Sequence, residues 1–322
     1  MDFAVSKRPS LRSDNLVALE NAGWDDEANT YGLSHSRAEL IALGMSSTSF
    51  PTKQVRLQAY DLEASSIDEL SAVLEDQGVV KVQGVFSEAV LSKLEAAASS
   101  ALHYVETLPV AALEPDGTVK SATLDGSAET LGLTFVTRHS PQRWDLYPAS
   151  GHLVPELSGL DAVHPKVRAL IKKHMGCCEW KKDADGFLPV LPLAAPGQWH
   201  RDTRSMFTWP ERRDEAAPEA SSVSADHCDE LDMSLPNFYF TLICYLNDLE
   251  DGACDTEIVL GSHKTSILKA CANATLATAN AQRGEAILFN GKALHRGGPS
   301  TSAQGTRQAF YLTCNAKWYA DV

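Results

Sequence analysis

The fold and the chemistry of this chain are both suggested by one stretch, Pro-Gly-Gln-Trp-His-Arg-Asp at residues 196–202. In an extended strand the side chains alternate between two faces, so His200 and Asp202 point the same way and can share one metal ion. A later stretch, Leu-His-Arg-Gly-Gly at residues 294–298, supplies a second imidazole from His295. Two histidines and one carboxylate form the 2-His-1-carboxylate facial triad, which binds non-haem Fe(II) and leaves coordination positions open. A lone His-x-Asp arises often by chance, so the prediction depends on the combination.

The composition limits the classes of partner. The chain has 322 residues, of which 44% are hydrophobic, so it can bury a sizeable core in one large domain or two small ones. Its 28 basic and 42 acidic residues give a net charge of 28 − 42 = −14. A chain of this charge repels a phosphate backbone or an anionic membrane surface, so we expect neither nucleic acid nor a membrane as partner.

The cysteines and the N-terminal sequence indicate the cellular compartment of the protein. Seven scattered cysteines, an odd number, do not form a disulfide framework and are typical of reduced core packing. The first residues have no apolar stretch of a signal peptide, and no run of 18 apolar residues occurs. We therefore expect a soluble protein of a reducing compartment, the cytoplasm.

The N-terminal part predicts an extension followed by supporting helices. Residues 1–60 show no sustained periodicity and are interpreted as an extension of a single domain over 61–322. A helix should begin after Ser66, where a serine is followed three residues later by Glu69 in a capping box, and should end at Gly78. A strand over 79–82 follows, and then a second helix after a capping serine.

The middle of the chain is less informative. A strand is predicted at 133–136 and a helix at 165–174. Proline favours an edge or bulged strand at 187–193. The acidic segment at about 210–234 is interpreted as a surface insertion, either an inert loop or a lid. Four polar residues in a turn-rich segment suggest a solvated loop or, alternatively, a pocket mouth: Arg138, His139, Arg143 and His152.

The C-terminal third predicts the fold class. Short strands separated by turn residues are expected at 237–247, 256–260, 284–290 and 306–314. Such spacing indicates a two-sheet jelly roll. The expected class is α+β, mainly β, with a double-stranded β-helix (jelly roll, cupin-like) core and supporting N-terminal helices.

Arg307 on the last strand suggests a co-substrate. A guanidinium presents a fork of N–H donors that can hold a carboxylate with two hydrogen bonds. The co-substrate 2-oxoglutarate needs such a cation for its distal carboxylate while its 2-oxo acid end chelates iron. Without the triad, a surface ion pair would be the simpler role for Arg307.

Several motifs together resemble the phytanoyl-CoA dioxygenase family of Fe(II)/2-oxoglutarate-dependent oxygenases. The resemblance covers roughly residues 66–318. It rests on a helix–strand–helix segment at 75–91, on Gln-Trp-His-Arg-Asp and Leu-Gly-Ser-His-Lys, and on the glycine-flanked run at 284–300 followed by Arg307. It implies iron held by His200, Asp202 and His295, with the 2-oxoglutarate carboxylate on Arg307. By the same resemblance, Thr256 is a second co-substrate contact.

The chain departs from the family pattern at two places. Relatives usually carry a glutamine one position before Gln198, where this chain has Gly197. Gln198 would still share a strand face with the two ligands that follow it, so it remains a candidate contact for the co-substrate. The turn before Thr256 is longer than in relatives, which puts the role of Thr256 in doubt more than the triad.

The expected activity is oxidation of a C–H bond of a small organic molecule by O2 and 2-oxoglutarate, releasing succinate and CO2. Hydroxylation is the default outcome, and desaturation or oxidative cyclisation stays open. Candidate substrate contacts are Trp199, Arg204 and Phe207, with aromatic core packing as the alternative for the two aromatic residues. Two other interpretations remain: a non-redox cupin-like metal enzyme, or a catalytically silent jelly-roll binding protein.

Overall fold

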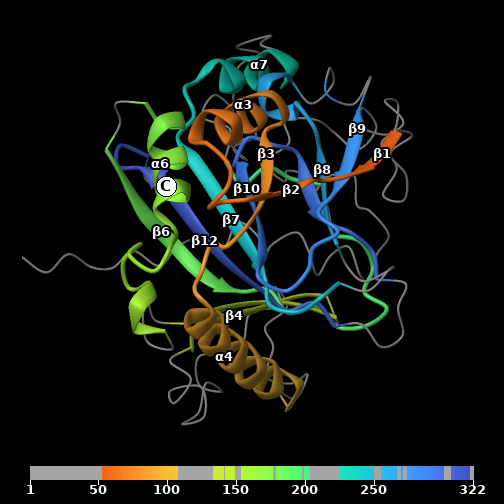
Figure 1. The fold of residues 1–322 in the computed structure, drawn as a ribbon. Coiled ribbons are helices and arrows are strands. Elements are labelled where there is room, and N and C mark those ends of the chain that lie inside the picture. The colour runs from red at the N-terminus through yellow and green to blue at the C-terminus, as the bar shows by residue number, and fades with distance from the viewer. Residues whose placement is uncertain are drawn as a thin grey trace, which may run out of the picture.

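Two β-sheets packed face to face form the centre of the structure (Figure 1). The computed structural model describes residues 53–107, 133–140, 142–148, 154–176, 179–197, 199–203, 225–249, 255–266, 270, 274–300 and 306–319. Within them, the elements are β1 (Lys53–Arg56), β2 (Ala59–Asp61), α3 (Ile67–Gln77), β3 (Val79–Gln83), α4 (Glu88–Thr107), β4 (Leu133–Ser140), β5 (Arg143–Pro148), η3 (Pro155–Leu157), α6 (Pro165–His174), β6 (Trp180–Phe187), α7 (Ala225–Ser234), β7 (Tyr239–Tyr245), β8 (Thr256–Val259), η4 (Ser262–Lys264), β9 (Thr275–Thr278), β10 (Glu285–Asn290), β11 (His295–Gly297) and β12 (Ala309–Ala316).

The larger sheet has the strand order β2-β3-β10-β7-β12-β6-β5-β4, and the smaller has the order β1-β9-β8-β11. Neighbouring strands are antiparallel except in the pairs β1–β9 and β2–β3. This arrangement of two facing sheets is the predicted double-stranded β-helix, or jelly roll.

The central strands of the larger sheet, β10, β7 and β12, divide their side chains between two cores. On β10, Ile287 and Phe289 point between the sheets, where they pack with Ile258 of the smaller sheet. The alternate residues Ala286 and Leu288 belong to the core on the opposite face. Alternation with period two therefore buries both faces of the central strands.

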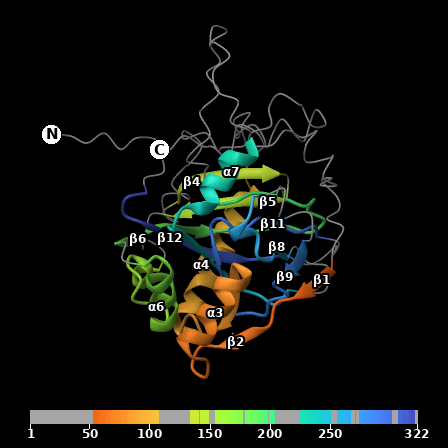
Figure 2. The ribbon, with the colours of Figure 1, turned by 90° about the horizontal axis from the view of Figure 1, so that it is seen from above.

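Three helices cover that opposite face. Figure 2 shows α3, α4 and α6 together on one side of the large sheet, with α7 on the other side of the molecule. The predicted second helix is α4, which buries Leu91, Leu94 and Ala98 in the core there. The predicted helix at 165–174 is α6, and its buried residues are Val167, Leu170 and Ile171.

Helix α3 has the predicted ends. The backbone N–H of Glu69 donates to the Ser66 hydroxyl oxygen at 3.1 Å, which caps the N-terminus. Gly78 closes the helix with φ 80°, in the left-handed region that glycine adopts without strain. A side chain at this position would also meet the ring of His263, whose Nδ1 lies 2.4 Å from the place of a Cβ atom.

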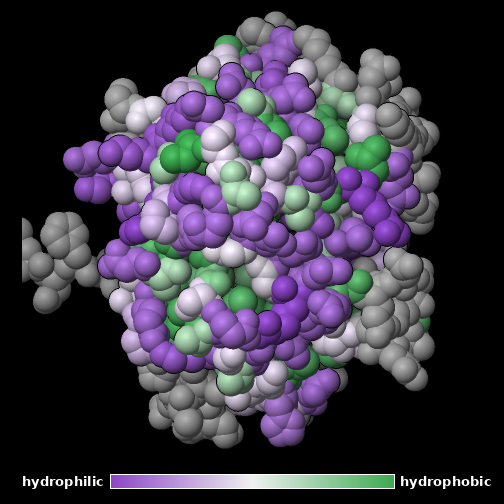
Figure 3. Space-filling view, in the orientation of Figure 1, coloured by the Kyte–Doolittle hydropathy of each residue, from purple (hydrophilic) through white to green (hydrophobic). Residues whose placement is uncertain are grey.

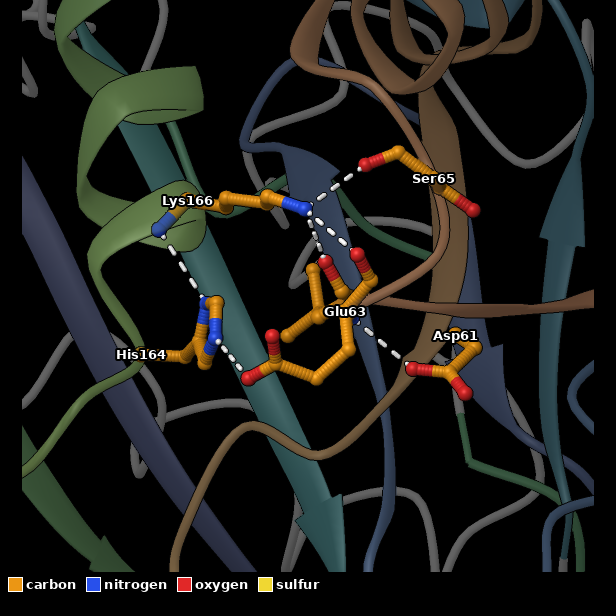
Figure 4. A network of polar contacts seen from close by, with 6 residues as sticks. Asp61, Glu63, Ser65, His164 and Lys166 are labelled. Carbon is orange, nitrogen blue, oxygen red and sulfur yellow. Dashed lines mark hydrogen bonds and ion pairs between the residues drawn. The ribbon is translucent and has the colours of Figure 1, made fainter.

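A network of polar contacts fastens the turn before α3 to the start of α6 (Figure 4). The ammonium group of Lys166 donates to the carbonyl oxygens of Leu62 at 2.5 Å, Glu63 at 3.0 Å and Ser65 at 2.9 Å. His164 caps α6 by accepting from the Lys166 backbone N–H at Nδ1, and its Nε2 lies 3.1 Å from the Glu63 carboxylate. The helices on this face are thus joined by hydrogen bonds as well as by apolar packing.

The structure adds elements that the sequence did not predict. Strands β5, β6 and β9 were not expected. Beyond the end of β6, the run 187–193 contributes two isolated bridges at Val190, to Arg143 and to Arg307. Part of the predicted extension, residues 53–60, lies in β1 and β2. The second half of the acidic insertion forms α7, while residues 1–52 and 204–224 lie outside the described residues.

The described residues contain no helix that is long and apolar enough to cross a membrane. Hydrophilic residues cover most of the face seen in Figure 3, with smaller hydrophobic patches among them. The described cysteines Cys244 and Cys314 are buried free thiols in the core beneath the helices. Burial raises the pKa of both thiols to about 12, so they remain protonated and serve as apolar packing.

Candidate metal centre

His200 and His295 lie side by side although they are 95 residues apart in the sequence (295 − 200). Each donates its backbone N–H to the other's carbonyl oxygen, at 2.9 and 3.0 Å, in an isolated antiparallel bridge. A directly opposed pair in such a bridge places its side chains on the same face. The two imidazole rings accordingly lie with their centroids 4.3 Å apart.

Asp202 completes the cluster. Its Oδ1 atom lies 3.7 Å from Nε2 of His200 and 3.6 Å from Nε2 of His295. One ligand atom from each of the three residues falls within 4.8 Å of the others. The side chains of Asp202 and His295 are 4% and 7% exposed, whereas that of His200 is 34% exposed, so the cluster is open to solvent on the His200 side. The residues that the sequence predicted as metal ligands are therefore brought together.

The imidazole of His295 is held in one orientation. Its Nδ1 lies 3.0 Å from the carbonyl oxygen of Ala293, and the Phe289 ring packs 4.6 Å from it, centroid to centroid. A carbonyl oxygen can only accept, so Nδ1 carries the proton and Nε2 presents its lone pair toward Asp202. This is the tautomer that a metal ligand requires.

Asp202 is fixed through both its backbone and its side chain. The carbonyl oxygen of Gly291 accepts from the N–H groups of Asp202 at 2.8 Å and Thr203 at 3.2 Å. The hydroxyl group of Thr241, on β7, donates to Oδ2 of Asp202 at 2.5 Å. Gly291 has no room for a side chain, because a Cβ atom there would lie 2.6 Å from Cδ1 of Tyr239.

Arg143 joins the two segments that carry the ligands. From β5 its Nε donates to the carbonyl oxygen of Ala195 at 2.8 Å, and its Nη2 donates to that of Gly298 at 2.5 Å. The prediction that Arg143 lies in a solvated loop was wrong, since the residue is buried at 8% exposure. The turn-rich sequence around Arg143 did not indicate the strand β5, in which the arginine donates hydrogen bonds to backbone carbonyl oxygens.

Trp199 and Arg296, which neighbour two of the ligands in sequence, pack against each other. The Arg296 guanidinium lies over the Trp199 ring at 4.6 Å and its Nε donates to the Glu257 carboxylate at 2.5 Å. All three residues are buried. Trp199 thus makes a buried cation–π contact with Arg296. Its predicted contact with substrate stays a prediction.

A second group of buried polar residues surrounds Arg307, just before β12. Arg307 is 5% exposed and is bridged to Val190 through two backbone hydrogen bonds of 2.9 Å. Its positive charge acts to lower the pKa of the Asp255 carboxyl and of the Tyr245 phenol. Tyr245 lies opposite Ala309 in the β7–β12 register. Burial raises the pKa of Asp255 to about 6, although two backbone N–H groups and the charges of Arg307 and a lysine oppose that rise.

Thr256 lies near this arginine. Its hydroxyl oxygen accepts a hydrogen bond of 2.8 Å from the Tyr245 hydroxyl group, and burial raises the pKa of that phenol. In the β8–β11 register Thr256 pairs with Gly297, and Ile258 pairs with His295. Two residues of a strand span about 7 Å, so Thr256 lies that far along the sheet from the level of the ligand His295.

The remaining predicted site residues, Gln198, Arg204 and Phe207, lie outside the described residues. Sequence reasoning also missed Thr241 and Asp255. The signal for Thr241 was a polar residue at an inward position of a strand that is otherwise apolar and aromatic.

Comparisons with known proteins support the fold. No family model matches the chain, and no curated protein matches its sequence. Among solved structures, the chain resembles AviO1 from Streptomyces viridochromogenes Tue57 with a TM-score of 0.51 and 15% identity, over 79% of this chain and 97% of AviO1. The likeness at this identity concerns the fold alone.

Two further structures are similar at lower scores. One is described as SnoK, a non-heme alpha ketoglutarate dependent carbocyclase from nogalamycin biosynthesis: TM-score 0.48, 16% identity, over 80% of this chain and 87% of SnoK. The other is SnoN, described as a non-heme alpha ketoglutarate dependent epimerase from the same biosynthesis: TM-score 0.48, 14% identity, over 78% and 82% of the two chains. At these scores the likenesses carry no inference about this chain.

Proposed function

We propose that the protein is a non-haem Fe(II)/2-oxoglutarate-dependent dioxygenase that oxidises a C–H bond of a small organic molecule. The observation that carries the proposal is the convergence of His200, Asp202 and His295 within 4.8 Å in the space between two jelly-roll sheets. Two imidazoles and one carboxylate are the donor set of non-haem Fe(II) oxygenases. The resemblance to the phytanoyl-CoA dioxygenase family remains a prediction from the sequence motifs.

The residues fit this metal and co-substrate. His295 presents Nε2 and Asp202 presents Oδ1, while His200 is the ligand closest to solvent. Arg307 is a buried cation just before β12, and it would hold the distal carboxylate of 2-oxoglutarate. Thr256 and its hydrogen-bonded neighbour Tyr245 would line the path between them. When bound, iron and 2-oxoglutarate would supply the O2 activation, with oxidation of the substrate coupled to release of succinate and CO2.

The arginine favours this function over a non-redox hydrolase. A zinc hydrolase requires the ligands and one water for its metal chemistry, so the metal site alone would not account for a buried arginine just before β12. The buried arginine also argues against a silent binding protein of purely apolar ligands. Hydroxylation is the simplest outcome of the proposed chemistry.

Succinate formation tests the proposal. The purified protein with Fe(II), 2-oxoglutarate and O2 should convert 2-oxoglutarate to succinate, slowly alone and faster with a substrate from a panel of candidate metabolites. His200→Ala, which removes one ligand, should abolish that conversion. Absence of succinate from the wild-type protein, with iron bound, would overturn the proposed activity.

A further inference from the structure

We propose that Thr241 is a positioning residue that makes Asp202 bind metal through one oxygen only. This inference rests on the proposed function, because it concerns how the chain prepares its metal site. The Thr241 hydroxyl group donates to Oδ2 of Asp202 at 2.5 Å. The other oxygen, Oδ1, is the atom that lies 3.7 and 3.6 Å from the two histidine Nε2 atoms. The two carboxylate oxygens therefore have separate partners.

The carboxylate cannot easily exchange these partners. The backbone N–H of Asp202 is bound to Gly291 at 2.8 Å, which fixes where the side chain begins. The Asp202 side chain is 4% exposed, so water does not compete for Oδ2. A charge-assisted hydrogen bond in such surroundings is stronger than one in water.

Thr241 itself is rigidly placed. It lies on β7, which is paired on one side with β10 and on the other with β12, and it is 4% exposed. Its β-branched side chain has few rotamers in a strand, so the hydroxyl group points steadily toward the cluster. The large sheet thus supplies the orienting group, while the segments around His200 and His295 supply the ligands.

The consequence concerns the number of open metal positions. Iron held by one atom from each of His200, Asp202 and His295 would keep coordination positions for 2-oxoglutarate and O2. A carboxylate bound through both oxygens would fill a fourth position and leave too few. By holding Oδ2 in a hydrogen bond, Thr241 would keep this oxygen from occupying a metal position that the co-substrate or O2 needs.

Co(II) is a suitable probe, because its visible absorption reports coordination without turnover. Thr241→Val replaces the hydroxyl by a methyl of the same shape and should weaken Co(II) binding by about 10-fold to 100-fold, the usual effect of losing an orienting partner. It should also change the Co(II) spectrum and weaken the binding of 2-oxoglutarate to the Co(II) form. Thr241→Ser, which keeps the hydroxyl, should restore all three.

Thr313→Val provides the matched control. Thr313 is opposite Thr241 in the β7–β12 register and is equally buried, but its hydroxyl group bonds to the backbone of Ala184, at 3.0 Å from the N–H group. This variant should leave the affinity for Co(II) and its spectrum unchanged. If Thr241→Val does not fold, Thr241→Ala removes the same hydroxyl without adding a methyl.

The outcomes separate the two proposals. A wild-type protein that does not bind Co(II) or Fe(II) would overturn the proposed function. A wild-type protein that binds Co(II), together with a Thr241→Val variant of equal affinity and unchanged spectrum, would overturn the role of Thr241 alone. A loss that Thr313→Val shares would show a general effect of the sheet and would also overturn it.

Discussion

At the scale of single residues, Arg307 distinguishes this site from a bare metal centre. Its guanidinium is buried at 5% exposure, and its positive charge favours the ionised form of the Asp255 carboxyl. Arg307→Ala should therefore raise the dissociation constant of 2-oxoglutarate at least tenfold, since a charge-assisted hydrogen bond is worth about 1.5–3 kcal/mol. Isothermal titration of the Co(II)-loaded protein measures this directly.

The metal affinity of the same variant serves as the control, because Arg307 contacts none of the ligands in the β-sheet registers described. Arg168→Ala, which removes an exposed ion pair with Asp161, should change neither affinity. An Arg307→Ala variant that bound 2-oxoglutarate as tightly as the wild type would contradict the co-substrate site.

At the scale of elements, the sequence was most informative where the local chemistry is self-contained. Helix α3 was predictable because Ser66 caps it and Gly78 ends it, and both signals act within one turn. The convergence of His200, Asp202 and His295 was predictable because the first two are two residues apart on one expected strand and His295 follows another expected strand. Strand β6 was not, since its partner β12 lies at the other end of the chain. Strand β5 was not predicted either, although it pairs with the preceding strand β4.

The residues that orient the site were not predictable either, because they also depend on contacts between distant parts of the chain. Arg143 bonds to Ala195 and Gly298, and Thr241 bonds to Asp202, across 52, 155 and 39 positions of the chain respectively. No local pattern encodes such pairings, because they result from which strands become neighbours in the sheet. The sequence therefore predicts the ligands of the site better than the residues that hold them.

At the scale of the whole molecule, His263 links the site side of the fold to the helices. Its Nε2 lies 3.0 Å from the carbonyl oxygen of Glu75, at the end of α3. Burial lowers the pKa of His263 from 6.5 to about 4, with the lysines nearby adding to that effect. The unfolded chain takes up this proton below pH 6.5 and the folded chain only near pH 4, so the free energy of unfolding should fall as the pH falls through that window.

The size of this effect is at most about 3 kcal/mol, at about 1.36 kcal/mol per pKa unit. Asp255, whose raised pKa acts in the opposite direction, makes the total slope smaller, so the wild type is compared with His263→Asn. Urea unfolding between pH 4 and pH 7 should show a shallower loss of stability in the variant. His103→Asn, which changes an exposed histidine of α4, is the control. Parallel pH curves for wild type and His263→Asn would contradict the assignment.

The central claim is that the three ligands and Arg307 together bind Fe(II) and 2-oxoglutarate in one site. Anaerobic titration of the protein with Fe(II) and 2-oxoglutarate tests it most directly, because the chelated complex has a visible metal-to-ligand charge-transfer band. We predict that the band appears in the wild-type protein, saturates at one equivalent of each component, and is absent from His295→Ala. Iron that binds without the band, or a band of equal intensity in His295→Ala, would contradict the claim.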